Sequence, residues 1–86
     1  MIYYSYSIKD TKAGAFGIPF FAQNDDLAKR QFMLAIRQGG AAMMNAFPAD
    51  FVLWKNGAFS DDVGTVNGGQ PEYMMNGQDA KNIMEG

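Results

Sequence analysis

The stretch that decides the fold is FPADFVLWKNGAFSDDVGTV, residues 47–66. Its segment DFVLWK alternates in the manner of a β-strand, because successive side chains of a strand point to opposite faces. Phe51, Leu53 and Lys55 share one face of this predicted strand, and Trp54 lies on the other. We therefore expect Trp54 to point away from the core that Phe51 and Leu53 enter.

Asn-Gly at residues 56–57 is typical of a tight hairpin turn. It predicts a short return strand, a second turn at DDVG (61–64) and a further extended segment at 65–66. A bulge at DDVG, inside one hairpin that continues to Val66, fits the pattern equally well. Pro48 prevents a preceding helix from running through residue 47.

Residues 2–9, IYYSYSIK, predict a strand rich in aromatic and β-branched types. Ile2, Tyr4, Tyr6 and Ile8 form its expected buried face, and Tyr3, Ser5, Ser7 and Lys9 form the other. IPFF, residues 18–21, predicts either a short strand or an extended lead-in, and Pro19 restricts a strand here to an edge because it cannot donate a ladder hydrogen bond.

Residues 24–38 predict the clearest element, a helix that Asn24 or Asp25 caps and that Gly39 and Gly40 end. Its apolar side comprises Ala28, Phe32, Ala35 and Ile36. We therefore expect an α+β fold of β-α-β-β order, a small, mostly antiparallel sheet with one helix on one face.

The last part of the chain changes character. Residues 68–86 are rich in Gly, Asn, Gln and Met and show little periodicity. We expect a compact domain over 1–67 and a flexible C-terminal tail over 68–86, partly disordered or ordered by a partner, with one short helix at 78–84. Methionine suits an irregular contact surface or a loosely filled core, and both readings stand for Met33, Met43, Met44, Met74, Met75 and Met84.

The composition excludes much chemistry. The 86 residues include no cysteine and no histidine, so disulfides, thiolate metal sites and histidine-based catalysis are excluded. The acid pairs at 25–26 and 61–62 fit a helix cap and a turn better than a Mg²⁺ site, and we expect no metal, no cofactor and no enzyme activity. A core of this size is marginal, which favours a homodimer.

No stretch approaches the roughly 20 apolar residues of a membrane span, and we expect no signal peptide in the first ten residues, which lack its basic and apolar regions. The net charge of −2 is unlike that of a basic nucleic-acid-binding domain, but a local basic stripe can act against it.

Aromatic and basic side chains provide candidate contacts for single-stranded DNA. Tyr3 and Trp54 are candidates to stack bases, because aromatic rings on an open sheet bind unpaired bases. The candidate phosphate contacts are Lys9, Lys12, Lys29, Arg30, Arg37 and Lys55. Two alternatives stand beside this reading: Trp54 fills a dimer interface, and the helix cations form a solvated face in which Asp26 pairs with Arg30.

Three groups of residues give the chain a family resemblance. The first is Tyr4, Ser5, Asp10, Lys12 and Ala13; the second is Phe21, Asn24, Asp25, Ala28, Arg30 and Phe32; the third is Phe47, Pro48, Asp50, Phe51, Leu53, Gly57, Phe59, Asp61 and Gly64. In these residues the chain resembles the small nonstructural protein of gokushovirus-type microviruses (Microviridae), which are tailless phages with circular single-stranded DNA. Ser60 stands where the pattern has an acid.

The resemblance spans residues 1 to 66 and implies a nonenzymatic viral accessory protein. It implies DNA binding in viral DNA synthesis or genome packaging, in the cytoplasm of the infected bacterial host. The alternative is a protein-interaction or dimerisation module that regulates replication or assembly through host or viral replication proteins, without direct DNA contact.

Overall fold

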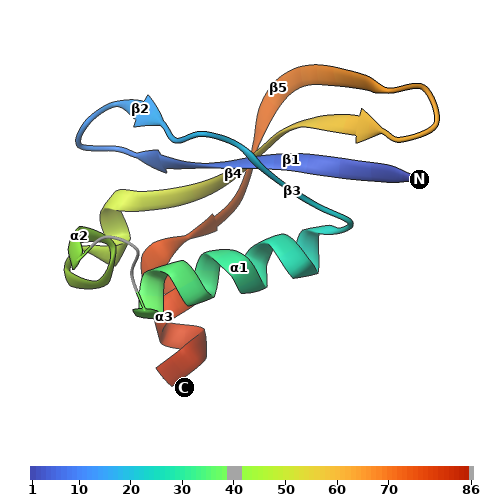
Figure 1. Cartoon of the computed structure of the whole chain (residues 1–86). Helices are drawn as coiled ribbons and strands as arrows, with labels where there is room; N and C mark the ends of the chain where they lie inside the picture. The colour runs from blue at the N-terminus through green and yellow to red at the C-terminus, as the bar shows by residue number, and fades with distance from the viewer. Residues whose placement is uncertain (39–41, 86) are drawn as a thin grey trace.

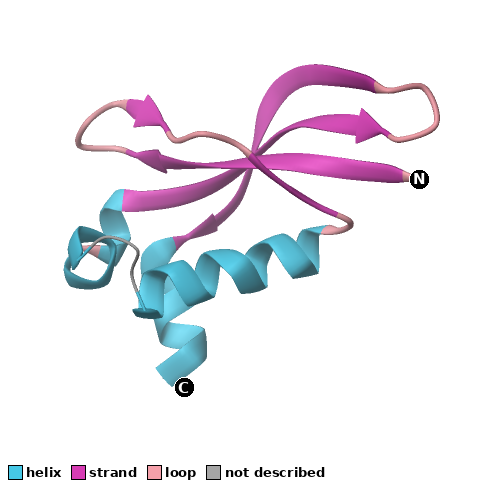
Figure 2. Cartoon of the chain, viewed as in Figure 1, coloured by secondary structure: helices cyan, strands magenta, loops and turns pink. Residues whose placement is uncertain are grey.

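The computed structural model describes residues 1–38 and 42–85 of the chain. The described part forms an antiparallel sheet with helices on one side of it (Figures 1 and 2). In chain order the elements are β1 (Ile2–Asp10), β2 (Ala15–Phe16), β3 (Phe20–Ala22), α1 (Asp25–Gln38), α2 (Ala42–Ala46), the 3₁₀ turn η1 (Pro48–Asp50), β4 (Phe51–Ser60), β5 (Thr65–Asn76) and α3 (Gly77–Glu85). The expected α+β class is confirmed.

Strand β1 lies at the centre of the sheet. It pairs with β4 along one edge and with the short strands β2 and β3 along the other. Strand β5 then pairs with the outer edge of β4. The expected edge strand is present as β3, which begins just after Pro19 because proline cannot contribute a ladder hydrogen bond.

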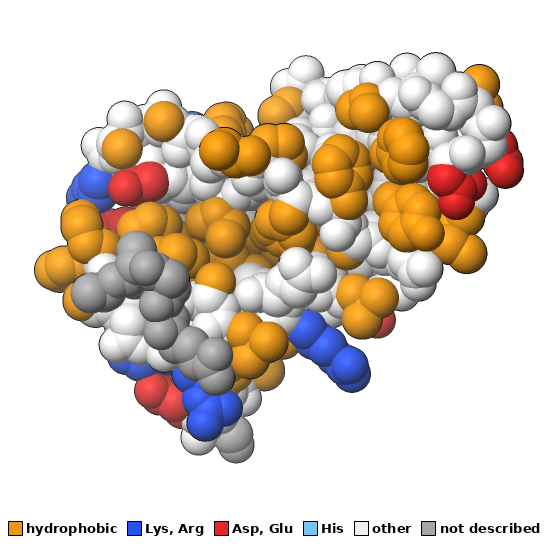
Figure 3. Space-filling model, in the orientation of Figure 1, with side chains coloured by type: hydrophobic (Ala, Val, Ile, Leu, Met, Phe, Trp, Pro, Cys, Tyr) orange, Lys and Arg blue, Asp and Glu red, His pale blue; other side chains and the backbone are white. Residues whose placement is uncertain are grey.

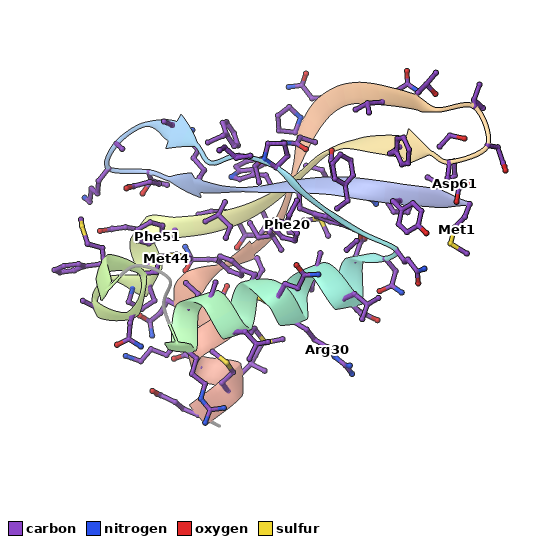
Figure 4. The ribbon with its side chains drawn as sticks, in the orientation of Figure 1. Met1, Phe20, Arg30, Met44, Phe51 and Asp61 are labelled. Carbon is purple, nitrogen blue, oxygen red and sulfur yellow. The ribbon has the colours of Figure 1, made fainter. Side chains whose placement is uncertain are left out.

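The core lies between the sheet and α1. Tyr6 and Leu53 from the strands are fully buried there, and α1 contributes Phe32 and Ile36. In Figure 4 Phe51 lies between the strands and α1, whereas Arg30 extends from α1 away from the sheet. Five methionines pack against this core, which favours core filling over a free contact surface: Met33, Met44, Met74, Met75 and Met84.

The predicted cap of α1 is present, since the side chain of Asn24 accepts a hydrogen bond from the backbone N–H of Leu27 at 2.9 Å. The helix extends to Gln38. The predicted stop at Gly39 and Gly40 lies outside the described residues. Within the described ranges, no helix combines the length and apolarity that crossing a membrane requires.

The predicted turn at Asn56-Gly57 is wrong. Strand β4 continues through these residues without a reversal. The chain reverses at DDVG, where Gly64 has a positive φ of 75°. The pairing instead shifts at this point: Lys55 opposes Tyr6 and Gly57 opposes Ser5, which leaves Asn56 as an extra residue. Asn56-Gly57 is therefore a β-bulge, and the alternative bulge at DDVG is also wrong.

The structure also differs from the predicted tail. Residues 68–76 continue β5, so the expected boundary after residue 67 falls inside a strand. The expected short helix is present as α3, where Ala80 is fully buried in the core. Gly68, Gly69 and Pro71 break the alternation of β5, which is why the sequence pattern does not predict this strand.

Candidate nucleic-acid interface

The sheet has a second face, which points away from α1. We call it the open face. The pairing register places its strand residues side by side, because Tyr3 opposes Phe59, Ser7 opposes Trp54 and Lys9 opposes Phe16. Its side chains are Tyr3, Ser5, Ser7 and Lys9 of β1, Phe16 of β2, Phe21 of β3, Val52, Trp54, Asn56 and Phe59 of β4, and Val66, Tyr73 and Asn76 of β5.

Three aromatic rings gather at one end of the open face. Trp54 meets Phe16 and Tyr73 edge to face, with ring centroids 6.2 and 5.9 Å apart. The ammonium of Lys9 lies 5.1 Å from the centroid of the Phe16 ring. Phe16 is 45% exposed and Tyr73 is 53% exposed, so these two rings present most of the accessible surface of this Trp54 cluster.

Three further rings form a second group, the Tyr3 cluster. Phe59 lies between Tyr3 and Phe21, with centroids 6.4 and 6.2 Å away. Phe21 is 43% exposed. Figure 3 shows hydrophobic side chains gathered over the strands in the upper half of the view.

A buried polar seam separates the two clusters. The hydroxyl of Ser5 donates to the side-chain oxygen of Asn56 at 2.7 Å, and the amide nitrogen of Asn56 donates to the hydroxyl of Ser7 at 2.8 Å. Both serines are buried, at 5% and 1% exposure. These polar side chains thus pair with one another, as buried polar groups generally do.

The bulge at Asn56 is what brings both clusters to one face. Trp54 and Phe59 are five residues apart, so a regular strand would point them to opposite faces. The extra residue in β4 shifts the alternation by one position, and both rings then lie on the open face.

The predicted contact residues divide between the two layers of the molecule. Tyr3, Lys9 and Trp54 lie on the open face, as the alternation predicts. Lys12 lies in the exposed turn between β1 and β2, near the Trp54 cluster end of β1. The cations Lys29, Arg30 and Arg37 lie on α1, in the helical layer beyond the other face.

Lys55 points toward α1, as its parity predicts, and forms part of a bridge between the two layers. Its ammonium lies 3.1 Å from a carboxylate oxygen of Asp25 and 4.0 Å from the Tyr4 ring centroid. The same Asp25 oxygen accepts a hydrogen bond of 2.6 Å from the hydroxyl of Tyr6. Lys55 therefore holds the sheet to the start of α1 and is not available to the open face.

The Tyr6–Asp25 contact shifts the pKa of both groups. The hydrogen bond from Tyr6 lowers the pKa of Asp25, burial opposes this, and Lys55 lowers it further. Burial raises the pKa of Tyr6 above its usual range, and the Asp25 carboxylate raises it again. The contact thus favours a charged carboxylate and a neutral phenol.

Sequence reasoning missed four aromatic residues of the open face. Phe16 lies in a segment that reads as a turn, and Tyr73 lies in the predicted tail. Phe21 and Phe59 are recognisable as aromatic positions, but only the pairing register shows that Phe59 meets Tyr3 and that Phe21 lies on the same face. One further group is distinctive: the indole N–H of Trp54 is buried and has no hydrogen-bond partner within the described residues.

These features define a small α+β protein whose sheet is covered by helices on one face and carries aromatic clusters on the other. A family model described as phage ORF5 protein matches residues 3–80. The chain therefore belongs to the phage ORF5 protein family and is a phage protein. The match extends beyond residue 66, through β5 and into α3. No curated protein and no solved structure matches the chain.

Proposed function

We propose that this phage protein binds single-stranded DNA on the open face, as a nonenzymatic accessory protein in viral DNA synthesis or genome packaging. The observation that carries the proposal is the pair of partly exposed aromatic clusters on one sheet face. Unpaired bases stack on such rings, with roughly 1–3 kcal/mol per base. The resemblance to the nonstructural protein of single-stranded-DNA microviruses supports the same role, which places its action inside the infected bacterium.

The charge distribution supports this placement. The two carboxylates within the strands, Asp10 and Glu72, oppose residues of the helix side, Phe51 and Lys55. The described strand positions of the open face therefore carry one cation, Lys9, and no carboxylate. Lys9 and the neighbouring Lys12 are the phosphate contacts in this proposal, and a base held against Phe16 brings its phosphate close to Lys9.

Stacking explains a preference for single strands. A ring needs the flat surface of a base, which duplex DNA hides within its own stack. The net charge of −2 opposes the approach of DNA, and Lys9 and Lys12 provide only two phosphate contacts, so salt lowers the affinity moderately. We expect weak binding that is clearest at low ionic strength.

Fluorescence anisotropy with a labelled single-stranded oligonucleotide tests the proposal. Tyr73→Ala removes an exposed ring, and we expect it to weaken binding about 5- to 150-fold. Leu34→Ala is the matched control, since Leu34 is 51% exposed but lies on α1. Absence of wild-type binding at low salt would contradict the proposal.

The cations provide a second test. Lys9→Gln should reduce the dependence of log affinity on log salt by about 0.7, the contribution of one phosphate contact to a single strand. Arg30→Gln on α1 should leave that dependence unchanged. The reverse pattern would place DNA on the helical layer and refute the assignment to the open face.

A second candidate function is a protein-interaction or dimerisation module that has no contact with DNA. The same exposed apolar side chains favour it, since Phe16, Phe21, Val66 and Tyr73 are each at least 43% exposed. A second copy of the chain, or a viral or host replication protein, would then cover the open face. Where the occupant is a second copy, this candidate predicts a dimer mass in light scattering that Tyr73→Ala reduces to a monomer, and for either occupant it predicts no DNA affinity in the anisotropy titration.

A further inference from the structure

We propose that the Trp54 cluster and the Tyr3 cluster are two separate sites that stack bases of one DNA strand, and that neither site distinguishes the four bases. This inference rests on the proposed function and specifies the kind of ligand that the open face takes. The ligand is a single strand long enough to reach both clusters, of any sequence.

The two clusters are separate because the polar seam lies between them. Along β1, Tyr3 marks one cluster and Ser7, which opposes Trp54, marks the other. Four residues of a strand span about 13 Å. Among the residues that the structure describes, no aromatic contact joins a ring of one cluster to a ring of the other. One base therefore cannot engage both sites.

The separation sets the length of the ligand. A DNA strand rises 3.4 Å per nucleotide when its bases are stacked as in a duplex, so about 13 Å corresponds to roughly four nucleotides. A more extended strand covers the distance with fewer. Once one base is stacked, the second cluster meets its base at a high effective concentration, because both bases belong to one molecule.

The seam explains why base identity is not read. Recognition of a base edge needs donors and acceptors that are free to pair with it. The side chains of Ser5, Asn56 and Ser7 pair with one another instead, and of the three the two serines are buried while Asn56 is half-buried. Apart from the buried indole N–H of Trp54, the rings of the clusters carry only the hydroxyls of Tyr3 and Tyr73 as polar groups, and a hydroxyl both donates and accepts, so it discriminates weakly.

Thymidine oligonucleotides that range from shorter to longer than about four nucleotides test the inference. The single tryptophan provides the readout for one cluster, since a base stacked there changes its fluorescence, and anisotropy reports total affinity. For the wild-type protein we expect a step in affinity of about 5- to 150-fold as the length passes the span of the two clusters. Longer chains should add only a gradual increase.

Phe21→Ala removes the exposed ring of the Tyr3 cluster and should abolish this step, while the change in tryptophan fluorescence persists. Leu34→Ala should retain the step. A step that survives Phe21→Ala, or a smooth dependence on length in the wild type, would overturn the two-site inference but leave DNA binding intact. If adenine, cytosine, guanine and thymine oligonucleotides of one length differ in affinity by more than about tenfold, the inference that the open face does not distinguish bases is overturned.

A strand of the same length that lacks bases separates stacking from phosphate contact. We expect it to bind far more weakly than the thymidine strand, and equal affinity would overturn stacking at both clusters. If the wild type binds none of these strands at low salt, the proposed function itself fails. The failure of the function and the failure of the two-site arrangement thus give different results.

Discussion

The bulge in β4 makes a sharp prediction about two glycines that oppose each other. Gly57 of β4 pairs with Gly68 of β5. A Cβ atom at Gly57 would lie 2.5 Å from the carbonyl oxygen of Asn67 and 2.8 Å from the Ser5 hydroxyl oxygen. A Cβ atom at Gly68 would meet nothing within 4 Å. The same substitution to alanine therefore has opposite consequences at two positions that face each other.

Non-bonded heavy atoms normally lie at least about 3.5 Å apart, so the 2.5 Å approach of the new Cβ atom forces β4 and β5 apart by about an ångström in Gly57→Ala. Overpacking of this kind costs about 1–3 kcal/mol. The Ser5 hydroxyl must also move, which disturbs its hydrogen bond to Asn56. Gly68→Ala encounters no such contact and restricts the unfolded chain, which stabilises a protein by about 0.4–1 kcal/mol where the backbone conformation suits alanine.

Thermal and urea unfolding, followed by circular dichroism, measure both variants against the wild type. A domain of this size changes its Tm by roughly 4–8 °C per kcal/mol, so we expect Gly57→Ala to lower the Tm by on the order of 10 °C. Gly68→Ala should leave the Tm unchanged or raise it slightly. If Gly57→Ala proves as stable as Gly68→Ala, the close approach of the strands at the bulge is refuted.

Three further predictions concern the core, α3 and the bridge between the layers. Phe32→Ala should cost about 3–5 kcal/mol in urea unfolding because Phe32 is fully buried, while Leu34→Ala should stay within about 0.5 kcal/mol. Gly77→Ala should lower the free energy of unfolding by about 1–3 kcal/mol, since its Cβ would overlap the Pro48 carbonyl. Gly69→Ala is the control, because a Cβ atom there meets nothing within 4 Å. Equal stability of the two variants would contradict the docking of α3. Folding lowers the pKa of Asp25, so the Asp25 carboxylate stabilises the folded protein. This stabilisation is fully present above the pKa of the unfolded chain, about 3.9, and is lost as the pH falls through the lower pKa of the folded protein. The urea midpoint should therefore drop more steeply below about pH 4 in the wild type than in Asp25→Asn, and equal slopes would count against the Tyr6–Asp25 contact.

The sequence predicts those elements in which local pattern and burial agree. The alternation of residues 2–9 matches β1, and the apolar stripe and cap of residues 24–38 match α1. It also predicts that Trp54 and Lys55 point to opposite faces, because β4 is regular at these two residues with respect to β1. In these elements, each side chain is positioned by neighbours that lie close in sequence.

Prediction from the sequence is wrong where the role of a residue depends on a contact with a distant strand. Asn56-Gly57 has the chemistry of a turn, but here asparagine is used to bond two serines of β1 and glycine to permit the close approach of β5. The sequence does not predict strand β5 for a related reason. Its residues from Thr65 to Tyr73 are exposed, so they show no apolar alternation, and pairing with β4 holds them in place.

The bulge at Asn56-Gly57, on which the Gly57→Ala prediction rests, also shapes the candidate site. Without the extra residue in β4, the alternation would send Phe59 toward the helical layer, and the Tyr3 cluster would lose the ring that joins Tyr3 to Phe21. The bulge also places Asn56 between the clusters, where its amide pairs with the serines and no ring can bridge the gap. One irregularity in the strand thus accounts for two stacking sites, for their separation, and for the lack of a free group between them that could read a base. A substitution at Gly57 that shifts β4 should therefore reduce the affinity for long oligonucleotides more than the affinity for short ones.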